Sequence, residues 1–360
     1  MGGGAHGSGL SGLRLSRPGP IGTANKARNH AGAPAVMNRS DLPLPSAADG
    51  RLRPFVMVAG PTASGKSALA LAIAQEFGGA VINADSMQVY RELSILTSRS
   101  GARELGTAPH RLYGVLPAGE RCSAGRWRQM ALAAVADEPA CLPIVTGGTG
   151  LYLRALTQGL SPIPDLDEDI QREGAALLAE IGAAGLHGKL ARLDPVTAAR
   201  LAPGDSQRIL RAWCVYRATG RTIADWQRET PLPDCGSHLT IALMPPRDAL
   251  YPATDARFLR MIDQGAVEEV RALLALDLDP LLPAMKAVGV RELGRALAGQ
   301  TTLAEAIAAA QQETRRYAKR QMTWLRHQMP EVTVFSEQFS ERILPEIFKN
   351  IRQFLLTVTL

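Results

Sequence analysis

A glycine-rich run is the first part of this sequence whose residue types could do chemistry, because it fits the pattern G-x-x-x-x-G-K-[ST]. Its members are Gly60, Pro61, Thr62, Ala63, Ser64, Gly65, Lys66 and Ser67. In such a loop, successive backbone N–H groups and the N-terminus of the following helix point at one anion. Lys66 adds a full positive charge, and the hydroxyl of Ser67 can ligate Mg²⁺. The run therefore predicts a site for a polyphosphate.

A carboxylate follows the next strand-like segment, in the run Asn83-Ala84-Asp85-Ser86-Met87-Gln88-Val89-Tyr90. Ligands of open α/β sheets bind at the carboxyl ends of the strands, which is where Asp85 would stand. From the residues alone, Asp85 is a catalytic base or a carboxylate beside a metal ion. The alternative is a plain turn or N-cap residue.

The elements that must position these residues alternate between strand and helix. Apolar, strand-like segments lie at residues 55–59, 80–83, 111–115, 142–146 and 238–243, and Ala-rich helical stretches lie between them. Such alternation predicts an α/β fold with a parallel sheet that is covered by helices on both faces. From Arg257 onwards the pattern is mostly helical.

The strand pattern stops after Pro162-Ile163-Pro164, where residues 167–184 and 187–201 predict helices alone. We therefore expect a small helical insertion in the core. The predicted division is a disordered leader at 1–54, the first part of the core at 55–160, the helical insertion at 161–205, the rest of the core with a helical C-terminal part at 206–345, and a tail at 346–360.

The composition is that of an ordinary globular chain, with 46% hydrophobic and 21% charged residues. It excludes a wholly disordered protein and a collagen-like repeat. No apolar run approaches the ~18 residues that a bilayer requires, so we expect no membrane association. The four cysteines, Cys122, Cys141, Cys214 and Cys235, have no Cys-x-x-Cys spacing, which argues against a zinc ribbon and favours the reducing cytosol.

The net charge of +6 is concentrated at the N-terminus. The first 54 residues hold seven Lys and Arg but only two acidic residues, which leaves about +1 for the rest of the chain. This leader is a mobile tail, an artefact of an upstream start codon with Met37 as the true initiator, or an organelle transit peptide. The first two predict a cytoplasmic protein, and the third predicts a mitochondrial one.

Nucleic-acid binding must therefore be argued from local clusters of basic residues. Arg208, Arg211 and Arg217 recur at helical spacing beside Gln207. A second cluster interleaves cations with aromatic residues; its members are Arg315, Arg316, Tyr317, Lys319, Arg320, Trp324 and Arg326. Phosphate contacts and base stacking are typical of RNA recognition. The alternative for both clusters is an amphipathic helix with a basic outer face.

Several motifs together resemble one family, the tRNA dimethylallyltransferases (tRNA isopentenyltransferases) of bacterial type. They are the glycine-rich run 60–67, Asp85-Ser86-Met87-Gln88-Val89-Tyr90-Arg91, Thr146-Gly147-Gly148-Thr149-Gly150-Leu151-Tyr152, Gln207-Arg208-Ile209, and residues 314–324. They stand in the family's order and span residues 55–330. The resemblance implies a P-loop NTPase-like sheet.

The resemblance also implies a reaction. The family transfers a dimethylallyl group from dimethylallyl diphosphate to N6 of the adenosine 3′-adjacent to the anticodon, in tRNAs that read codons beginning with U, and releases diphosphate. We therefore expect Mg²⁺ as cofactor, dimethylallyl diphosphate and the tRNA anticodon stem-loop as partners, and a monomeric enzyme in the cytoplasm.

The family's site residues are carried over by position. Asp85 matches the general base and Thr149 a threonine near the reacting centre; the glycine-rich run and Arg257 match the diphosphate-binding residues, with Ser67 on the metal. The segment before Arg257 lacks an arginine that the family usually has. The implied tRNA-binding residues are Asp85, Ser86, Met87, Gln88, Thr149, Arg172, Gln207, Arg208, Ile209, Leu210, Arg211, Arg315, Lys319 and Arg320.

Three alternative functions share the glycine-rich run. They are a P-loop kinase of a small metabolite, an adenylate isopentenyltransferase that acts on free nucleotides, and an NTP-dependent RNA-binding switch. The kinase and the switch would bind a nucleoside triphosphate, which prenyl transfer does not need. The basic and aromatic segment at 315–326 favours tRNA over a free nucleotide as acceptor.

Overall fold

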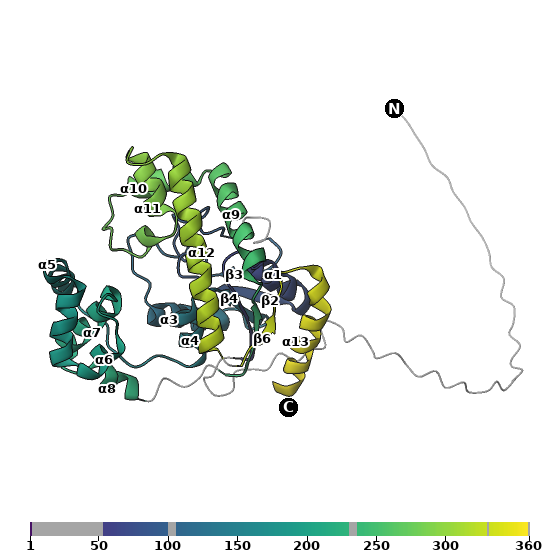
Figure 1. Ribbon diagram of the computed structural model, residues 1–360. Helices are drawn as coiled ribbons and strands as arrows, with labels where there is room; N and C mark the ends of the chain where they lie inside the picture. The colour runs from purple at the N-terminus through teal and green to yellow at the C-terminus, as the bar shows by residue number, and fades with distance from the viewer. Residues whose placement is uncertain (2–52, 100–105, 230–235, 330, 359–360) are drawn as a thin grey trace, which may run out of the picture. The chain divides into compact units, whose positions relative to one another are not determined.

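The core of the protein is a sheet flanked by helices (Figure 1). In the part of the chain that the structure describes, the sheet has six strands in the order β3-β2-β4-β1-β5-β6, and every neighbouring pair is parallel. The computed structural model describes residues 1, 53–99, 106–229, 236–329 and 331–358. Residues 2–52 of the predicted leader and Cys235 lie outside this part. Arg53 is buried and donates to the Val135 and Glu138 carbonyls at 3.1 and 2.7 Å, so the predicted end of the leader at residue 54 is wrong. The strands are β1 (Phe55–Ala59), β2 (Gly79–Asn83), β3 (His110–Arg111), β4 (Leu142–Gly147), β5 (His238–Leu243) and β6 (Thr333–Phe335). The predicted α/β fold with a parallel sheet is confirmed.

At the edges of this sheet, one strand prediction is partly wrong and one strand was not predicted. The prediction for residues 111–115 is wrong beyond Arg111, because Leu112 and Gly114 take left-handed backbone angles (φ 67° and 62°) that bend the chain out of the strand. The short β6 was not predicted, since three residues carry too little alternation to stand out in a helical region.

Alternating side chains of β1 face opposite sides of the sheet, as the period of a strand requires. Val56 and Val58 belong to a hydrophobic cluster with α1 (Lys66–Phe77) and α13 (Leu344–Val358). Phe55 and Met57 belong to a cluster on the other face. The helices that contribute to this second cluster are α3 (Ala124–Ala136), α4 (Gly150–Thr157), α9 (Arg247–Asp263), α10 (Ala266–Leu274), α11 (Val290–Leu297) and α12 (Leu303–Gln328), and short 3-10 turns lie at η1 (Ala284–Lys286) and η2 (Glu341–Ile343).

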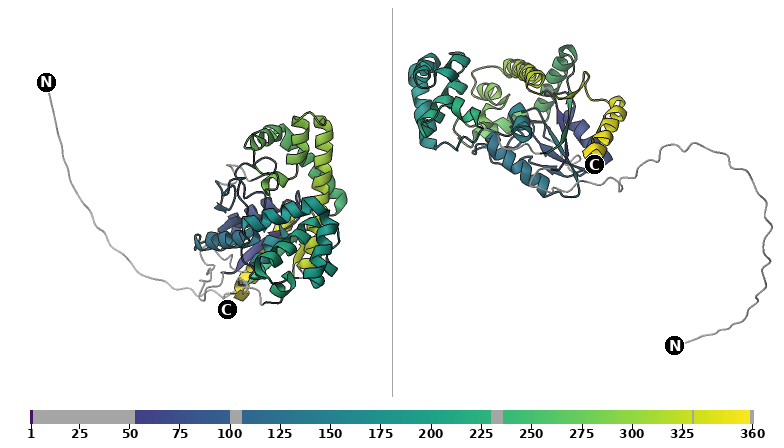
Figure 2. Two further views of the ribbon diagram at one scale, coloured as in Figure 1. Left: turned by 90° about the vertical axis from the view of Figure 1, so that its left-hand side faces the viewer. Right: turned by 90° about the horizontal axis from the view of Figure 1, so that it is seen from below.

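The C-terminal segment is a helix of the core, so the prediction of a tail from residue 346 is wrong. Ile347, Ile351 and Leu355 are buried at a spacing of four residues, and this apolar stripe is the signal that could have revealed the helix. Helix α13 lies beside α1 in Figures 1 and 2, and the rings of Phe77 and Phe348 meet edge to face at 5.5 Å.

The helices α5 (Glu168–Leu193), α6 (Pro195–Arg200), α7 (Ser206–Thr219) and α8 (Ile223–Arg228) surround a hydrophobic cluster of their own. The chain kinks at Gly182 (φ 70°, ψ 173°), which divides α5 near the predicted break at 184–187. Because Trp213 of α7 and Ile223 of α8 join the cluster, the helical part ends near Arg228, and the predicted boundary at 205 is wrong.

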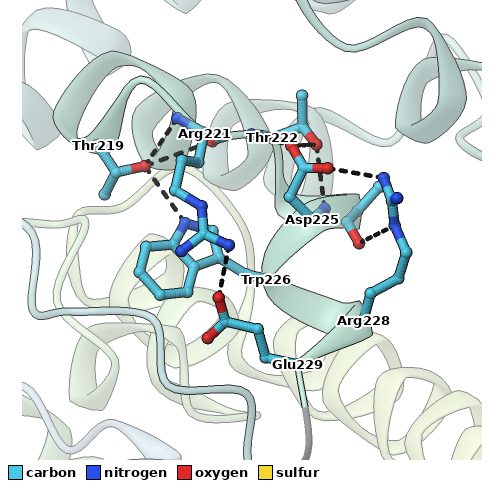
Figure 3. Close-up of polar contacts among 8 residues, drawn as sticks. Thr219, Arg221, Thr222, Asp225, Trp226, Arg228 and Glu229 are labelled. Carbon is cyan, nitrogen blue, oxygen red and sulfur yellow. Dashed lines mark hydrogen bonds and ion pairs between the residues drawn. The ribbon is translucent and has the colours of Figure 1, made fainter.

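Polar contacts hold the last turn of this helical part together (Figure 3). Thr222 and Asp225 cap each other's backbone at the start of α8. The Arg221 guanidinium lies 4.0 Å from the centroid of the Trp226 ring and pairs with Glu229 at 2.5 Å. These contacts fix the short helix α8 against the end of α7. Within the described residues, no helix is long and apolar enough to span a bilayer.

Candidate active site

The glycine-rich loop, Asp85 and Thr149 come together at the carboxyl edge of the sheet. Ala59 at the end of β1 is in register with Gly147 of β4, and Asn83 of β2 is in register with Thr146 of β4. All strands run in the same direction, so the segments that follow these three strands leave the sheet on one side. Those segments carry the glycine-rich loop, Asp85 and Thr149.

The glycine-rich loop has the backbone of an anion-binding turn. Ala63 (φ 62°) and Gly65 (φ 88°) take left-handed angles, and the Ser64 N–H bonds to the Pro61 carbonyl at 3.3 Å. The Ala63 carbonyl accepts a hydrogen bond from Gln338 Nε2 at 3.2 Å, and the Ser64 carbonyl accepts one from the Phe339 N–H at 3.0 Å. Residues 338–339 thus hold the backbone of the loop at Ala63 and Ser64. No motif in the sequence predicted this contact.

Lys66 is half-buried and has charged neighbours. Its Nζ donates to the Pro61 carbonyl at 3.3 Å. Burial lowers the pKa of Lys66 to about 8, with the Asp85 carboxylate opposing the fall and the Arg257 guanidinium adding to it. A bound anion would favour the charged form again, so the loop is built to receive negative charge.

Arg257 of α9 reaches the glycine-rich loop. Its Nη1 donates to Thr62 Oγ1 at 2.6 Å, its Nε to Ser98 Oγ at 2.9 Å, and its Nη2 to the Thr97 carbonyl at 3.1 Å. Burial lowers the pKa of Arg257, and the Asp85 carboxylate opposes the fall. A guanidinium stays protonated at physiological pH, and these contacts hold its positive charge beside the phosphate cradle.

Asp85 is held in place by its own turn. The Asn83 side chain accepts from the Asp85 N–H at 2.8 Å and donates to the Asp85 carbonyl at 3.0 Å. Trp127 Nε1 in turn donates to the Asn83 carbonyl at 2.8 Å. Asp85 Oδ1 accepts from the Met87 N–H at 2.9 Å. Among the described residues, Oδ2 accepts no hydrogen bond, so both of its lone pairs are available to a substrate.

Thr149 links the second glycine-rich turn to the Asp85 turn. Its Oγ1 accepts from the Ser86 N–H at 2.9 Å and lies 3.2 Å from Ser86 Oγ. Burial and the Asp85 carboxylate raise the pKa of Tyr317, while side-chain hydrogen bonds with Thr149 and Gln321 lower it. The phenol of Tyr317 therefore stays protonated beside the site.

Gln321 of α12 joins the two glycine-rich turns. Its Oε1 accepts from the Thr62 N–H at 2.9 Å and its Nε2 donates to the Gly148 carbonyl at 2.9 Å. Trp324, one turn later, lies against Gly150 so closely that a Cβ there would overlap the indole. The sequence analysis assigned no role to Gln321. A polar residue inside the buried stripe Ala318, Gln321, Met322 was the available signal.

The other predicted RNA contacts of the core differ in exposure. Gln88 is half-buried, and its Nε2 donates to the Thr97 carbonyl at 2.9 Å. Arg315 forms an ion pair with Asp255 of α9, in which Nη1 of Arg315 lies 2.6 Å from each carboxylate oxygen, and both side chains are only 32% exposed. Lys319 and Arg320 are exposed, whereas Ser86 and Met87 are half-buried beside Asp85. The charge of Arg315 is thus already neutralised within the protein.

The predicted contacts of the helical part are mostly on its surface. Arg172 pairs with Asp169, and Arg208 lies 3.6 Å from Asp205. Those two arginines, Gln207 and Arg211 are exposed, and Leu210 is half-buried. Ile209 is fully buried in the cluster of the helical part, so its side chain packs inside this part, and its contact with RNA stays a prediction. Its neighbours along α7 face solvent because helical spacing puts them on other faces.

The donors available to a metal ion are few. Within the described residues, no three His, Cys, Asp or Glu side chains are grouped as metal ligands. Ser67 is exposed in the first turn of α1. Mg²⁺ prefers oxygen ligands, keeps several waters, and often binds through substrate phosphates with one or two protein oxygens. The site therefore fits a Mg²⁺ ion that is carried mainly by a diphosphate.

Comparisons with known proteins agree with this geometry. The family model described as IPP transferase matches residues 88–328, and the one described as Isopentenyl transferase matches residues 54–115. The tRNA dimethylallyltransferase of Paramagnetospirillum magneticum is 54% identical over 310 residues, which are 84% of this chain and 98% of that protein. The one from Rhodospirillum centenum is 55% identical over 282 residues, with coverages of 77% and 90%.

Solved structures are similar as well. The crystal structure of the full-length tRNA isopentenylpyrophosphate transferase from Bacillus halodurans has a TM-score of 0.62 and 31% identity, and the match covers 85% of this chain and 97% of that one. A eukaryotic dimethylallyltransferase captured in crystallographic snapshots of its action on tRNA has a TM-score of 0.71 and 25% identity, with coverages of 83% and 77%.

Proposed function

This chain belongs to the IPP transferase family, and from that premise we propose that it transfers a dimethylallyl group from dimethylallyl diphosphate to N6 of the adenosine 3′-adjacent to the anticodon of tRNA. The acceptors are tRNAs that read codons beginning with U, and diphosphate is released. One observation carries the proposal: the anion-binding loop and the Asp85 carboxylate share one sheet edge, and Gln321 and Thr149 connect the turns around them.

The leaving group is stabilised by the loop. When the allylic C–O bond breaks, negative charge develops on the diphosphate while the allyl carbon becomes positive. The N–H groups at the N-terminus of α1, the ammonium of Lys66 and the guanidinium of Arg257 would bind that charge. In precedents, one such donor contributes ~3–4 kcal/mol to the transition state. Ser67 would hold a Mg²⁺ ion, which adds positive charge to the same oxygens.

The nucleophile is an exocyclic amine whose lone pair is delocalised into the adenine ring. It becomes reactive as a proton leaves, so a base must accept that proton while the new C–N bond forms. Asp85 has one oxygen fixed by the Met87 N–H and the other directed to no donor among the described residues. We assign the proton transfer to that second oxygen. The adenosine must leave its stack to reach it.

The tRNA contacts follow from exposure and position. Ser86, Met87 and Gln88 lie in the Asp85 turn and would read the adenine. The exposed residues that would contact the anticodon stem-loop are Arg172, Gln207, Arg208, Arg211, Lys319 and Arg320. Arg315 is assigned to holding α9 against α12 instead. Within this proposal the enzyme works as a monomer in the cytoplasm.

A kinase of a small metabolite is a weaker alternative. Gln321 occupies one N–H of the loop, that of Thr62, and Tyr317 places a phenol beside Asp85. Neither is needed for phosphoryl transfer, whereas a tRNA modifier needs a docking surface such as the exposed Lys319 and Arg320. A transferase that acts on free adenine nucleotides would not need these exposed cations either.

The decisive experiment incubates the purified enzyme with labelled dimethylallyl diphosphate, Mg²⁺ and unmodified tRNA. We expect label in the RNA, located at the adenosine next to the anticodon after nuclease digestion. Parallel reactions replace tRNA with AMP, or replace the prenyl donor with γ-labelled ATP. Label in AMP alone would support the free-nucleotide transferase, and consumption of ATP without prenyl transfer would support a kinase. Either result would overturn the proposal.

A further inference from the structure

A carboxylate outside the site described above grips a turn next to it. Glu269 lies in α10, and its Oε2 accepts hydrogen bonds from the N–H groups of Ser94 (2.8 Å) and Ile95 (2.7 Å). Its Oε1 accepts a third from the N–H of Leu96 at 2.9 Å. Three consecutive N–H groups that converge on one carboxylate are the arrangement of a helix N-terminus, with the anion supplied by a distant helix.

The same turn holds two residues of the proposed site from its other end. The Thr97 carbonyl accepts from Gln88 Nε2 at 2.9 Å and from Arg257 Nη2 at 3.1 Å. Ser98 Oγ accepts from Arg257 Nε at 2.9 Å. Two of the three hydrogen bonds that orient Arg257 therefore end on residues 97–98, and the third ends on Thr62.

The turn has a single, closely determined shape. Thr97 is buried, and its hydroxyl bonds to the Leu93 carbonyl at 2.8 Å. Ser98 takes a left-handed φ of 46°, and its N–H bonds to the Ile95 carbonyl at 2.9 Å. A non-glycine residue keeps such an angle only where its surroundings determine it. The Glu269 carboxylate is the ionised partner that binds the N-terminal side of this turn.

We propose that Glu269 is a positioning residue for the reaction: it fixes the 94–98 turn, which aims Arg257 at the diphosphate and Gln88 at the adenine. This inference rests on the proposed function of the site. It means that α10, which contributes none of the site residues above, sets the geometry of both substrates at once. Hydrogen bonds to an ionised acceptor are stronger than those to a neutral one. Loss of the carboxylate should therefore shift the turn and change the orientation of both Arg257 and Gln88.

Substitution of Glu269 by glutamine tests the charge of the side chain without changing its size. Glu269→Gln keeps the size of the side chain, but its NH₂ group must face an N–H of the turn in place of an oxygen. Glu268→Gln is the matched control, because Glu268 is exposed on the same helix and lies 3.7 Å from Arg271. Each enzyme is assayed for prenyl transfer with the donor and the tRNA varied in turn, at a temperature where circular dichroism finds both fully folded.

We expect Glu269→Gln to raise the KM for dimethylallyl diphosphate by about tenfold or more, since charge-assisted hydrogen bonds that orient Arg257 are lost. The KM for tRNA should rise as well, and Glu268→Gln should stay near the wild type in both. A double-mutant cycle completes the test. In an Arg257→Lys background, which removes the bonds to residues 97–98, Glu269→Gln should add little further loss in the KM for the donor.

Two results would overturn the inference. The first is an unchanged KM for both substrates in Glu269→Gln, and the second is full additivity with Arg257→Lys, which would mean a general effect on the fold. Failure of the proposed function is separate from both, because it would appear as an inactive wild-type enzyme in the same assay.

Discussion

Removal of the amide of Gln321 tests whether one buried side chain holds the two glycine-rich turns in register. Gln321→Met keeps a similar side-chain length but leaves the Thr62 N–H and the Gly148 carbonyl without their partner, each of which now makes a 2.9 Å hydrogen bond. The Gly148 bond is buried, and the Thr62 bond is partly buried. The substitution therefore deletes the contact without emptying the space.

The magnitude follows from these two bonds. A buried polar group left unpaired costs ~1–3 kcal/mol, and the half-buried Thr62 N–H lies at the lower end because water can reach it. Together they predict that the free energy of unfolding falls by about 2–4 kcal/mol. Thr62 also holds Arg257 at 2.6 Å, so movement of the loop should raise the KM for dimethylallyl diphosphate by about tenfold, equivalent to ~1.4 kcal/mol.

The assay combines urea unfolding with prenyl-transfer kinetics on the same preparations. Gln312→Met is the matched control, because Gln312 is exposed on the same helix and should change neither quantity. Gln321→Glu should still accept the hydrogen bond from the Thr62 N–H but can no longer donate one to the Gly148 carbonyl. Its negative charge should weaken the binding of dimethylallyl diphosphate further. A loss of less than ~0.5 kcal/mol with an unchanged KM would refute the assigned role of Gln321.

Three further predictions concern the charges of the site. Asp85→Asn should lower turnover by at least ~10²-fold while the binding of both substrates changes little; turnover close to the wild type would exclude Asp85 as the base. Since the pKa of Lys66 is lowered to about 8, its positive charge is present below that pH and lost above it. The KM for the diphosphate donor should therefore rise above pH 8 by up to about tenfold per pH unit, and Lys66→Met should lose this dependence; the same profile in both enzymes would contradict the prediction. Asp255→Asn should lower the free energy of unfolding by ~0.5–1 kcal/mol through its pair with Arg315, and the difference should shrink in 1 M NaCl because exposed pairs are screened. A difference that is independent of salt in parallel urea titrations would show that the pair contributes otherwise.

The sequence alone was sufficient to predict the phosphate-binding loop at 60–67 and the carboxylate of Asp85 as residues that could do chemistry. To bind an anion, the loop at 60–67 needs only its own backbone, a preceding strand and a following helix. Its pattern can therefore be recognised from neighbouring residues in the sequence. Asp85 was predicted by its position after a strand, since parallel strands bring their carboxyl ends to one edge, whereas Thr149 was predicted only from the resemblance to a family. Resemblance to a family supplied their roles and the position of Arg257.

Only the tertiary structure decided the contacts between segments that lie far apart along the chain. Gln321 accepts a hydrogen bond from the N–H of Thr62, which lies 259 residues away in the sequence. Glu269 accepts one from the N–H of Ser94, which lies 175 residues away. The ion pair of Arg315 with Asp255 was not predicted, because a basic residue on a helix has the same local pattern whether it faces solvent or pairs with an acidic residue. Periodicity records which face of an element is apolar, but it does not record which distant element covers that face. Packing determines that choice, and with it the orientation of the groups that would do the chemistry.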